Sequence, residues 1–195
     1  MSERPAGHFL VVCSANQCRS PLTAAILDAR LEALDLGIMV DSAGVGAMSG
    51  NPATPPTLDA ARSLGLDLSA HRSREVTPEM VQSADLVVTM ERRHVQEVVL
   101  ADPSAFPRTF TLKELVRRGT EVGPREPGEQ FDAWLARVHA GRRPADVLGM
   151  SKDDDVADPT GNALADHRTT ATELDVLAAS LLELLLPAHR RADDR

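Results

Sequence analysis

Residues 8–21 read His8-Phe9-Leu10-Val11-Val12-Cys13-Ser14-Ala15-Asn16-Gln17-Cys18-Arg19-Ser20-Pro21. The run at 8–12 is largely apolar, which is typical of a strand buried in a parallel sheet. Residues 13–20 are small and polar. Pro21 then begins a helix predicted over residues 21–34, because proline is favoured in the first turn and the apolar residues that follow share one face. The order strand, polar loop, helix therefore predicts an α/β fold.

The same alternation continues along the chain. Further strands are predicted over 38–43, 86–90 and 108–112, and helices over 57–64, 77–83, 91–100, 113–118, 129–139 and 165–186. Strands that alternate with helices favour a doubly wound parallel sheet with helices on both faces. Ligands of such sheets bind beyond the carboxyl ends of the strands, which is where residues 13–20 fall.

Length and charge exclude several classes of function. The 195 residues fit a single domain, and 29 acidic against 21 basic residues give a net charge of −8. That balance argues against nucleic acid and anionic lipid as partners. The sequence has no apolar run of about 18 residues and no apolar signal-peptide region near Met1. We therefore expect a cytoplasmic protein with no membrane partner, and the oligomeric state stays open.

Cysteine, histidine and aspartate patterns give no sign of a disulfide framework or a metal. There are two cysteines, Cys13 and Cys18, too few for the framework of a small secreted domain. The six histidines have no metal-ligand spacing. The acidic run 153–155 is interpreted as a solvated face. We expect neither a metal nor another cofactor.

Cys13 and Arg19 are the residues that point to a chemistry. Five residues separate them, and backbone N–H groups of such a loop can converge on an anion, with a helix N-terminus adding positive potential. That field favours a thiolate, the nucleophilic form of cysteine. A guanidinium holds two phosphoryl oxygens at once, and Ser20 can donate a hydrogen bond to the thiolate. The spacing alone arises easily by chance, so its weight comes from the strand before it and the Ser-Pro and helix after it. The phosphate-binding residues are then predicted to be Ser14, Ala15, Asn16, Gln17, Cys18, Arg19 and Ser20.

Asp158 is the candidate acid. Phosphoryl transfer to a thiolate needs a group that protonates the leaving oxygen and later accepts a proton from water. Asp158 is held by Pro159 just before the last predicted helix, where its carboxylate can project into a site. By itself, an Asp-Pro pair is more often a turn or a helix start.

Five more stretches accompany the loop in order: 41–44 (Asp-Ser-Ala-Gly), 65–71 (Gly-Leu-Asp-Leu-Ser-Ala-His), 84–86 with Met90, 158–159 (Asp-Pro) and 163–177. With these, the chain resembles the low-molecular-weight protein tyrosine phosphatase family over nearly its whole length. The resemblance implies a flavodoxin-like four-stranded sheet and metal-free hydrolysis through a phosphocysteine. It implies Cys13 as nucleophile, Arg19 as transition-state clamp and Asp158 as general acid. It also implies a supporting hydrogen-bond network of Asn16, Ser20, Ser42 and His71, and Cys18 as the redox partner of Cys13.

Four positions depart from the family pattern and leave the substrate open. Ala15 replaces a usual glycine, and Gln17 replaces an aliphatic residue or a threonine. The loop 44–50 lacks an aromatic residue, and Thr160 follows Asp-Pro where an aromatic is common. The main hypothesis is a phosphatase for phosphotyrosyl proteins. The alternative is a phosphatase for phosphoarginine or a small phosphate such as a sugar or a nucleotide-like metabolite. Arsenate reduction, for which the chain lacks a cysteine after Cys18, and a non-catalytic phosphate-binding module rank lower.

The predicted organisation is a single domain over 8–187 with flexible ends at 1–7 and 188–195. Residues 119–157 exceed the usual core of the family and are predicted to be an insert on the active-site rim, ahead of the Asp-Pro loop. The candidate substrate rim is Met48, Phe131, Trp134 and Thr160. In the alternative, the helix at 129–139 packs on the sheet edge and its two aromatics belong to the core.

Overall fold

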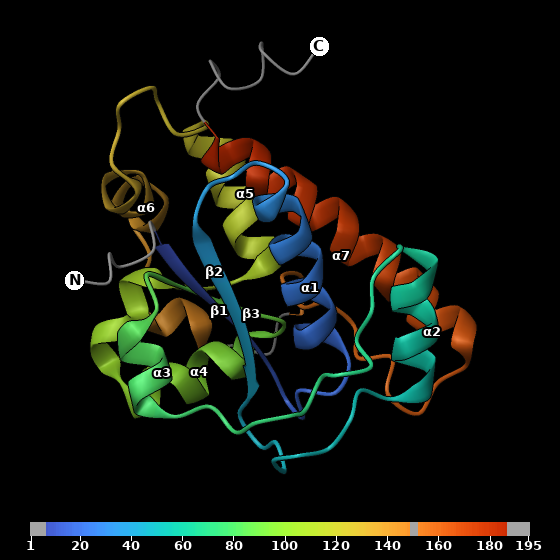
Figure 1. Cartoon of the computed structure of the whole chain (residues 1–195). Coiled ribbons are helices and arrows are strands. Elements are labelled where there is room, and N and C mark those ends of the chain that lie inside the picture. Colours follow the sequence, from blue (N-terminus) through green and yellow to red (C-terminus); the bar gives the residue numbers. More distant parts are fainter. Residues whose placement is uncertain (1–6, 149–151, 187–195) are drawn as a thin grey trace, which may run out of the picture.

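The computed structural model describes residues 7–148 and 152–186. Its sheet has four parallel strands in the order β2-β1-β3-β4 (Figure 1). They are β1 (Gly7–Cys13), β2 (Ile38–Gly44), β3 (Leu86–Thr89) and β4 (Thr109–Thr111). The predicted flavodoxin-like α/β sheet is confirmed.

β1 lies inside the sheet, and its sequence explains why. It pairs along its whole length with β2, from Gly7 opposite Ile38 to Cys13 opposite Gly44, and its middle pairs with β3. Side chains alternate between the two faces of a strand. Phe9 and Val11 enter one core and Leu10 and Val12 the other, and all four are buried. A continuous apolar strand is what a sheet covered on both faces requires.

Helices cover both faces of the sheet (Figure 1). The core on the Phe9 side is closed by α1 (Arg19–Glu32), α5 (Leu112–Val122) and α7 (Leu164–Leu185). The core on the Leu10 side is closed by α3 (Pro78–Ser83) and α4 (Arg92–Ala101). The remaining elements are α2 (Pro55–Ser63), which packs against α7, the 3-10 turns η1 (Pro103–Arg108) and η2 (Pro144–Val147), and α6 (Phe131–His139).

Threonine side chains fix the starts of three helices. The hydroxyl oxygens of Thr54, Thr77 and Thr111 accept hydrogen bonds from backbone N–H groups in the first turns of α2, α3 and α5. The helices lie close to their predicted ranges, with two clear differences. α1 begins at Arg19 rather than at Pro21, and α5 continues past residue 118 to Val122.

The predicted rim position of Phe131 and Trp134 was wrong. Figure 1 shows α6 beside the start of β1, at the opposite end of the strand from Cys13. Trp134 is fully buried, and its indole N–H donates to the carbonyl of Gly123 at 3.1 Å. The Phe131 ring lies 5.7 Å from the Phe9 ring, centroid to centroid. The alternative of a helix packed on the sheet edge is the observed one, because apolar residues at helical spacing bury their common face.

Two further predictions concern the flexible ends of the chain. Gly7, placed in a flexible N-terminus, is the first residue of β1. The remainder of that end, 1–6, and the predicted tail 188–195 lie outside the described residues.

The end of the predicted insert does return to the Cys13 end of the sheet. Asp154 is buried and its carboxylate pairs with Arg92 at 3.0 Å and Arg117 at 3.2 Å, so the predicted solvated face was wrong at this residue. Asp155 accepts a hydrogen bond from the backbone of Arg92, and the backbone N–H of Val156 donates to Met90. These contacts fasten residues 154–156 beside the end of β3.

Trp134→Ala is expected to lower the free energy of unfolding by about 3–5 kcal/mol, because it leaves a large cavity between α5, α6 and α7. Trp134→Phe keeps most of the packing and loses the bond to Gly123, so it should cost only about 1–2 kcal/mol. Urea unfolding of both variants measures the difference. A loss below about 1 kcal/mol for Trp134→Ala would contradict the buried position.

Candidate active site

Cys13 is the last residue of β1, and its sulfur lies inside the loop that leads to α1. Its side chain is buried, with Sγ 3.0 Å from the hydroxyl of Ser20. The backbone N–H of Asn16 donates to the same sulfur at 3.3 Å. An N–H donor and a hydroxyl thus lie within hydrogen-bond distance of one sulfur. The predicted pairing of Ser20 with Cys13 is present.

Asn16 organises the loop from its centre. Its φ of 53° lies in the left-handed region, which asparagine tolerates better than most residues. Its amide nitrogen donates to the hydroxyls of Ser20 and Ser42, each at 2.9 Å. Its backbone oxygen lies 2.7 Å from Nε2 of His71. The structure thus brings together all four residues of the expected network.

Arg74 joins this network and was missed in the sequence. Its backbone N–H donates to the side-chain oxygen of Asn16 at 3.0 Å, and its Nε donates to the carbonyl of Ser42 at 2.8 Å. No motif indicated this role, because Arg74 reaches the loop from an irregular segment. It gives the side-chain oxygen of Asn16 a hydrogen-bond donor, as Ser20 and Ser42 give acceptors to the side-chain nitrogen.

Ala15 carries no strain, although the family resemblance led us to expect glycine there. The residues other than glycine with positive φ in the described chain are Asn16 and Asp35. The position that requires glycine is Gly44 at the end of β2. A Cβ on Gly44 would lie 2.5 Å from the backbone oxygen of Ser14 and 2.8 Å from the backbone nitrogen of Asn16. Glycine at 44 therefore allows the loop to lie directly against β2.

Arg19 is buried to 1% exposure and is held on both sides of its guanidinium. Nη1 donates to the Glu91 carboxylate at 2.6 Å and to the backbone oxygen of Val156 at 2.9 Å. Nη2 donates to the carboxylate of Asp158 at 2.5 Å. The structure thus places Asp158, from a distant part of the sequence, on the arginine of the phosphate loop.

Glu91 is a second carboxylate at the site and was not singled out in the sequence. Burial raises its pKa, but hydrogen bonds from Arg93 and Arg19 outweigh burial and lower the pKa to about 2. The group is therefore charged at neutral pH. The available signal was position: Glu91 comes immediately after the predicted strand 86–90, at the carboxyl edge of the sheet.

Arg93 and His94 surround the hydroxyl of Ser14. Nη2 of Arg93 donates to Ser14 at 2.8 Å, and Nε2 of His94 lies 3.0 Å from the same oxygen. Burial lowers the pKa of His94 to about 4, so its ring is neutral, and its Nδ1 has no hydrogen-bond partner within the described chain. The Arg93 side chain is 57% exposed and presents its charge beside the loop. Neither residue was among the predicted site residues.

Cys18 lies behind the loop. It is buried, and its sulfur is 3.6 Å from Nδ1 of His167 in α7. Burial is the main reason that the pKa of Cys18 is raised to about 11. Its sulfur is therefore a neutral thiol at physiological pH, whereas a second nucleophile would have to be a thiolate.

The remaining predicted positions differ in what they can contact. Met48 is 74% exposed in the loop after β2. The backbone N–H of Thr160 donates to the Asp158 carboxylate at 3.0 Å, so this residue helps to position Asp158. The backbone oxygen of Gln17 accepts a hydrogen bond from Thr54.

Metal-ligating side chains do not cluster anywhere in residues 7–148 or 152–186. Among the helices that the structure describes, none combines the length and apolarity needed to cross a membrane.

Comparison with known proteins gives the family. The model of the low molecular weight phosphotyrosine protein phosphatases matches residues 8–137, from the start of β1 to α6. The chain belongs to this family. It is therefore a cysteine-dependent phosphatase, a hydrolase of phosphomonoesters. Asp158 lies beyond the matched segment, so its place in the site rests on its contacts with Arg19 and Thr160.

Relatives of two kinds are similar to this phosphatase. A probable low molecular weight protein-tyrosine-phosphatase, EpsP of Ralstonia nicotianae, is 34% identical over 68% of the chain and 96% of its own length. The protein-arginine-phosphatase of Geobacillus stearothermophilus is 31% identical over 91% of the chain and 95% of its own length. The crystal structure of the low molecular weight protein tyrosine phosphatase from T. tengcongensis has a TM-score of 0.70 at 30% identity, covering 92% of this chain and 99% of that one.

His94 makes the stability of this phosphatase depend on pH. The folded pKa is about 4 and the ordinary value 6.5, so between these values the unfolded chain binds more protons than the folded one. Stability is therefore lost as the pH falls through 6.5, by about 2 kcal/mol from this group between pH 7.5 and 5. His94→Gln should show a correspondingly smaller loss in urea unfolding at the two pH values. Equal losses in the two proteins would contradict a neutral, buried His94.

Alkylation should distinguish the two cysteines. With iodoacetamide at pH 7.5, peptide mass spectrometry is expected to find modification at Cys13, slowed by inorganic phosphate, and none at Cys18, whose pKa is raised to about 11. Modification of Cys18 at a comparable rate would contradict this environment.

Proposed function

We propose that the chain hydrolyses phosphotyrosine in proteins, with Cys13 as nucleophile, Arg19 as the clamp on the phosphoryl group and Asp158 as the acid. The observation that supports these roles best is the Arg19–Asp158 contact at 2.5 Å, because a carboxylate and a guanidinium then lie together at one thiol loop. Glu91 holds the other side of the fork, so Arg19 is fixed in orientation before a substrate arrives.

In the first step, the Cys13 thiolate attacks phosphorus and the bond from phosphorus to the tyrosine oxygen breaks. Arg19 exchanges its bond to Asp158 for bonds to phosphoryl oxygens, and the carboxyl proton of Asp158 moves to the leaving oxygen. Backbone N–H groups of the loop hold the remaining phosphoryl charge.

In the second step, water attacks the phosphocysteine. The Asp158 carboxylate accepts a proton from that water, and the bond from sulfur to phosphorus breaks, which releases phosphate and returns the thiolate. Ser20 donates its O–H either to the Ala43 carbonyl at 3.2 Å or to the sulfur at 3.0 Å, so it can follow the change of charge on Cys13.

Burial and charge at the loop support an aryl phosphate as the substrate. Cys13 and Arg19 are both nearly inaccessible, which favours a phosphate carried on a long side chain over one on serine or threonine. The exposed guanidinium of Arg93 beside the loop is attracted to the face of a phenyl ring and repels a second guanidinium. A neutral tyrosine ring therefore suits the surface beside the Cys13 loop better than the cationic side chain of phosphoarginine.

Phosphoarginine remains the second candidate because of one specific observation. The similarity to a protein-arginine-phosphatase extends over 91% of the chain, including the segment that carries Asp158. Two carboxylates at the site, Glu91 and Asp158, are groups that can bind a guanidinium. The two candidate substrates, phosphotyrosine and phosphoarginine, predict opposite effects of substituting Arg93.

Phosphate release from a phosphotyrosyl peptide, the matching phosphoarginyl peptide, and sugar and nucleoside phosphates tests the proposal. We expect the highest kcat/KM on phosphotyrosine and loss of all turnover in Cys13→Ser. A preference for phosphoarginine or for a small phosphate would overturn the substrate assignment, and turnover that survives Cys13→Ser would overturn the nucleophile.

Asp158→Asn should lower kcat on the phosphotyrosyl peptide by a factor of about 10²–10⁴, because the leaving phenolate is no longer protonated. The loss should be much smaller on p-nitrophenyl phosphate, whose leaving group is stable without a proton. A loss of equal size on both substrates would contradict the role of Asp158 as an acid.

Arg93→Gln should lower kcat/KM on the phosphotyrosyl peptide by about 5–10-fold and raise it on the phosphoarginyl peptide. Arg93→Lys keeps the charge and serves as the matched control, with a smaller effect on both. A change of the same direction and size on both peptides would show that Arg93 does not select the substrate.

A further inference from the structure

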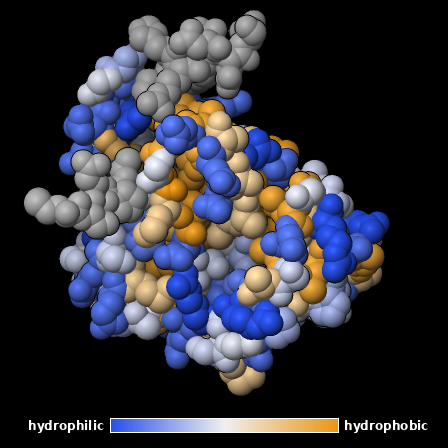
Figure 2. Space-filling model, in the orientation of Figure 1, coloured by the Kyte–Doolittle hydropathy of each residue, from blue (hydrophilic) through white to orange (hydrophobic). Residues whose placement is uncertain are grey.

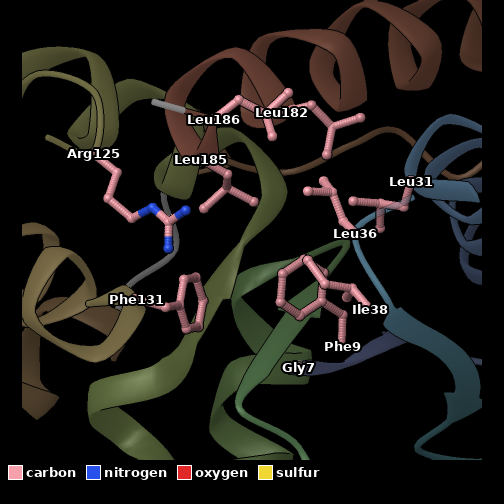
Figure 3. Close-up of a pocket in the computed structure, with 10 residues that line it drawn as sticks. All are labelled: Gly7, Phe9, Leu31, Leu36, Ile38, Arg125, Phe131, Leu182, Leu185 and Leu186. Atoms are coloured by element: carbon pink, nitrogen blue, oxygen red, sulfur yellow. The ribbon is translucent and has the colours of Figure 1, made fainter. Parts of the chain in front are cut away.

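A mostly apolar cavity lies at the other end of β1 from Cys13. Its volume is about 310 Å³. Figure 3 shows it between the beginnings of β1 and β2, the end of α7 and the first residue of α6. The lining residues are Gly7, Phe9, Leu31, Leu36, Ile38, Arg125, Phe131, Leu182, Leu185 and Leu186.

This cavity is open at an apolar part of the surface. Figure 2 shows hydrophobic residues at the surface in the upper part of the molecule, where the end of α7 lies, with hydrophilic residues on either side. None of its lining residues belongs to the Cys13 loop or to its supporting network.

Arg125 is the single charged residue among those that line the cavity. Its backbone N–H donates to the carbonyl of Leu184 at 2.8 Å, which fixes it against α7. Figure 3 shows its guanidinium directed toward the space between Phe131 and Leu185. Its Nε is buried and has no hydrogen-bond partner in the part of the chain that the structure describes. A buried donor without an acceptor destabilises the folded chain, so such a donor suits a bound acceptor.

The nearby carboxylate does not fill this position. Glu129 feels the charge of Arg125, but its carboxylate is bonded to Arg137 at 2.9 and 3.1 Å and to the backbone N–H of Glu126 at 2.9 Å. Arg125 therefore retains donor capacity toward the cavity.

We propose that this cavity binds a small amphipathic carboxylate, an aliphatic or aryl-alkyl acid. The leucines and two phenylalanines bury its hydrocarbon part, and Arg125 pairs with its carboxylate. The volume is at the small end of the usual range for ligand sites, and an apolar cavity with a few convergent polar groups is the usual composition of such sites. A guanidinium binds a carboxylate with two parallel hydrogen bonds, which gives the site its preference for an anion.

Binding is tested on the full chain with octanoate and 4-phenylbutyrate, and with the uncharged octanamide and 4-phenylbutyramide as matched probes. Saturating inorganic phosphate is present so that the Cys13 loop is not available to carboxylates. Calorimetry measures affinity, and methyl NMR locates the ligand through shifts at Leu36, Ile38 and Leu185. The acids are expected to bind at least about 10-fold more tightly than the amides, since a hydrogen bond to a charged group is worth about 1.5–3 kcal/mol.

Arg125→Gln is expected to lower the affinity for octanoate by about 10–100-fold and to leave the affinity for octanamide unchanged. Arg143→Gln is the matched control, because Arg143 is an exposed arginine whose side chain pairs only with Asp146 among described residues, and it should bind like the wild type. Leu36→Phe narrows the cavity and should lower the affinity for both octanoate and octanamide. Its Tm checks that this variant folds. Three results would each overturn the proposal: no binding of either acid at millimolar concentration, equal binding of acid and amide, or unchanged octanoate affinity in Arg125→Gln.

Discussion

The buried charge of Arg19 is the constraint on which the catalytic end of this molecule depends. A guanidinium at 1% exposure is tolerated only with compensating partners, because removing one partner of a buried ion pair costs about 3–5 kcal/mol. Glu91, Asp158 and the backbone of Val156 supply them from segments that follow β3 and precede α7. One side chain thus determines where three distant stretches meet, and the place where they meet is the thiol loop.

The parallel sheet makes this meeting possible. β1 and β3 are neighbours, so Cys13, the last residue of β1, and Glu91, two residues past the end of β3, lie at the same edge of the sheet. β2 on the other side contributes Gly44, where a side chain would collide with the loop backbone. Asn16 then fills the space between the strands with hydrogen bonds to Ser20 and Ser42. Hydrogen bonds of the Asn16 and Ser20 side chains therefore hold the loop in place before any substrate enters.

The predictable part of the structure followed from local patterns. All four strands were predicted from the sequence, the first from an apolar run, and the Cys13–Arg19 spacing between a strand and a Ser-Pro predicted the loop. Residues 131 and 134 could not be placed in this way, since an aromatic at helical spacing packs equally well on a sheet edge or on a site rim, and only the long-range contacts with Phe9 and Gly123 decide between them. Glu91, Arg93 and Arg74 were missed for a related reason. Their roles come from partners more than 50 positions away in the sequence, and a charged residue after a strand is ordinarily just solvated.

Charge around Arg19 also explains how a protein with a net charge of −8 can accept a phosphate. Arg19 is neutralised by two carboxylates, so the site offers an incoming dianion little net attraction unless one carboxylate gives way. Glu91 is held in place by its ion pair with Arg93, and its low pKa keeps it charged. Asp158, in contrast, is 37% exposed and lies on a loop. Asp158 is therefore the partner that we expect a bound phosphate to displace. In the proposed reaction the same displacement moves its carboxyl toward the leaving oxygen, where it can transfer a proton. Substrate binding and preparation of the acid are then one event, driven by competition for a single guanidinium.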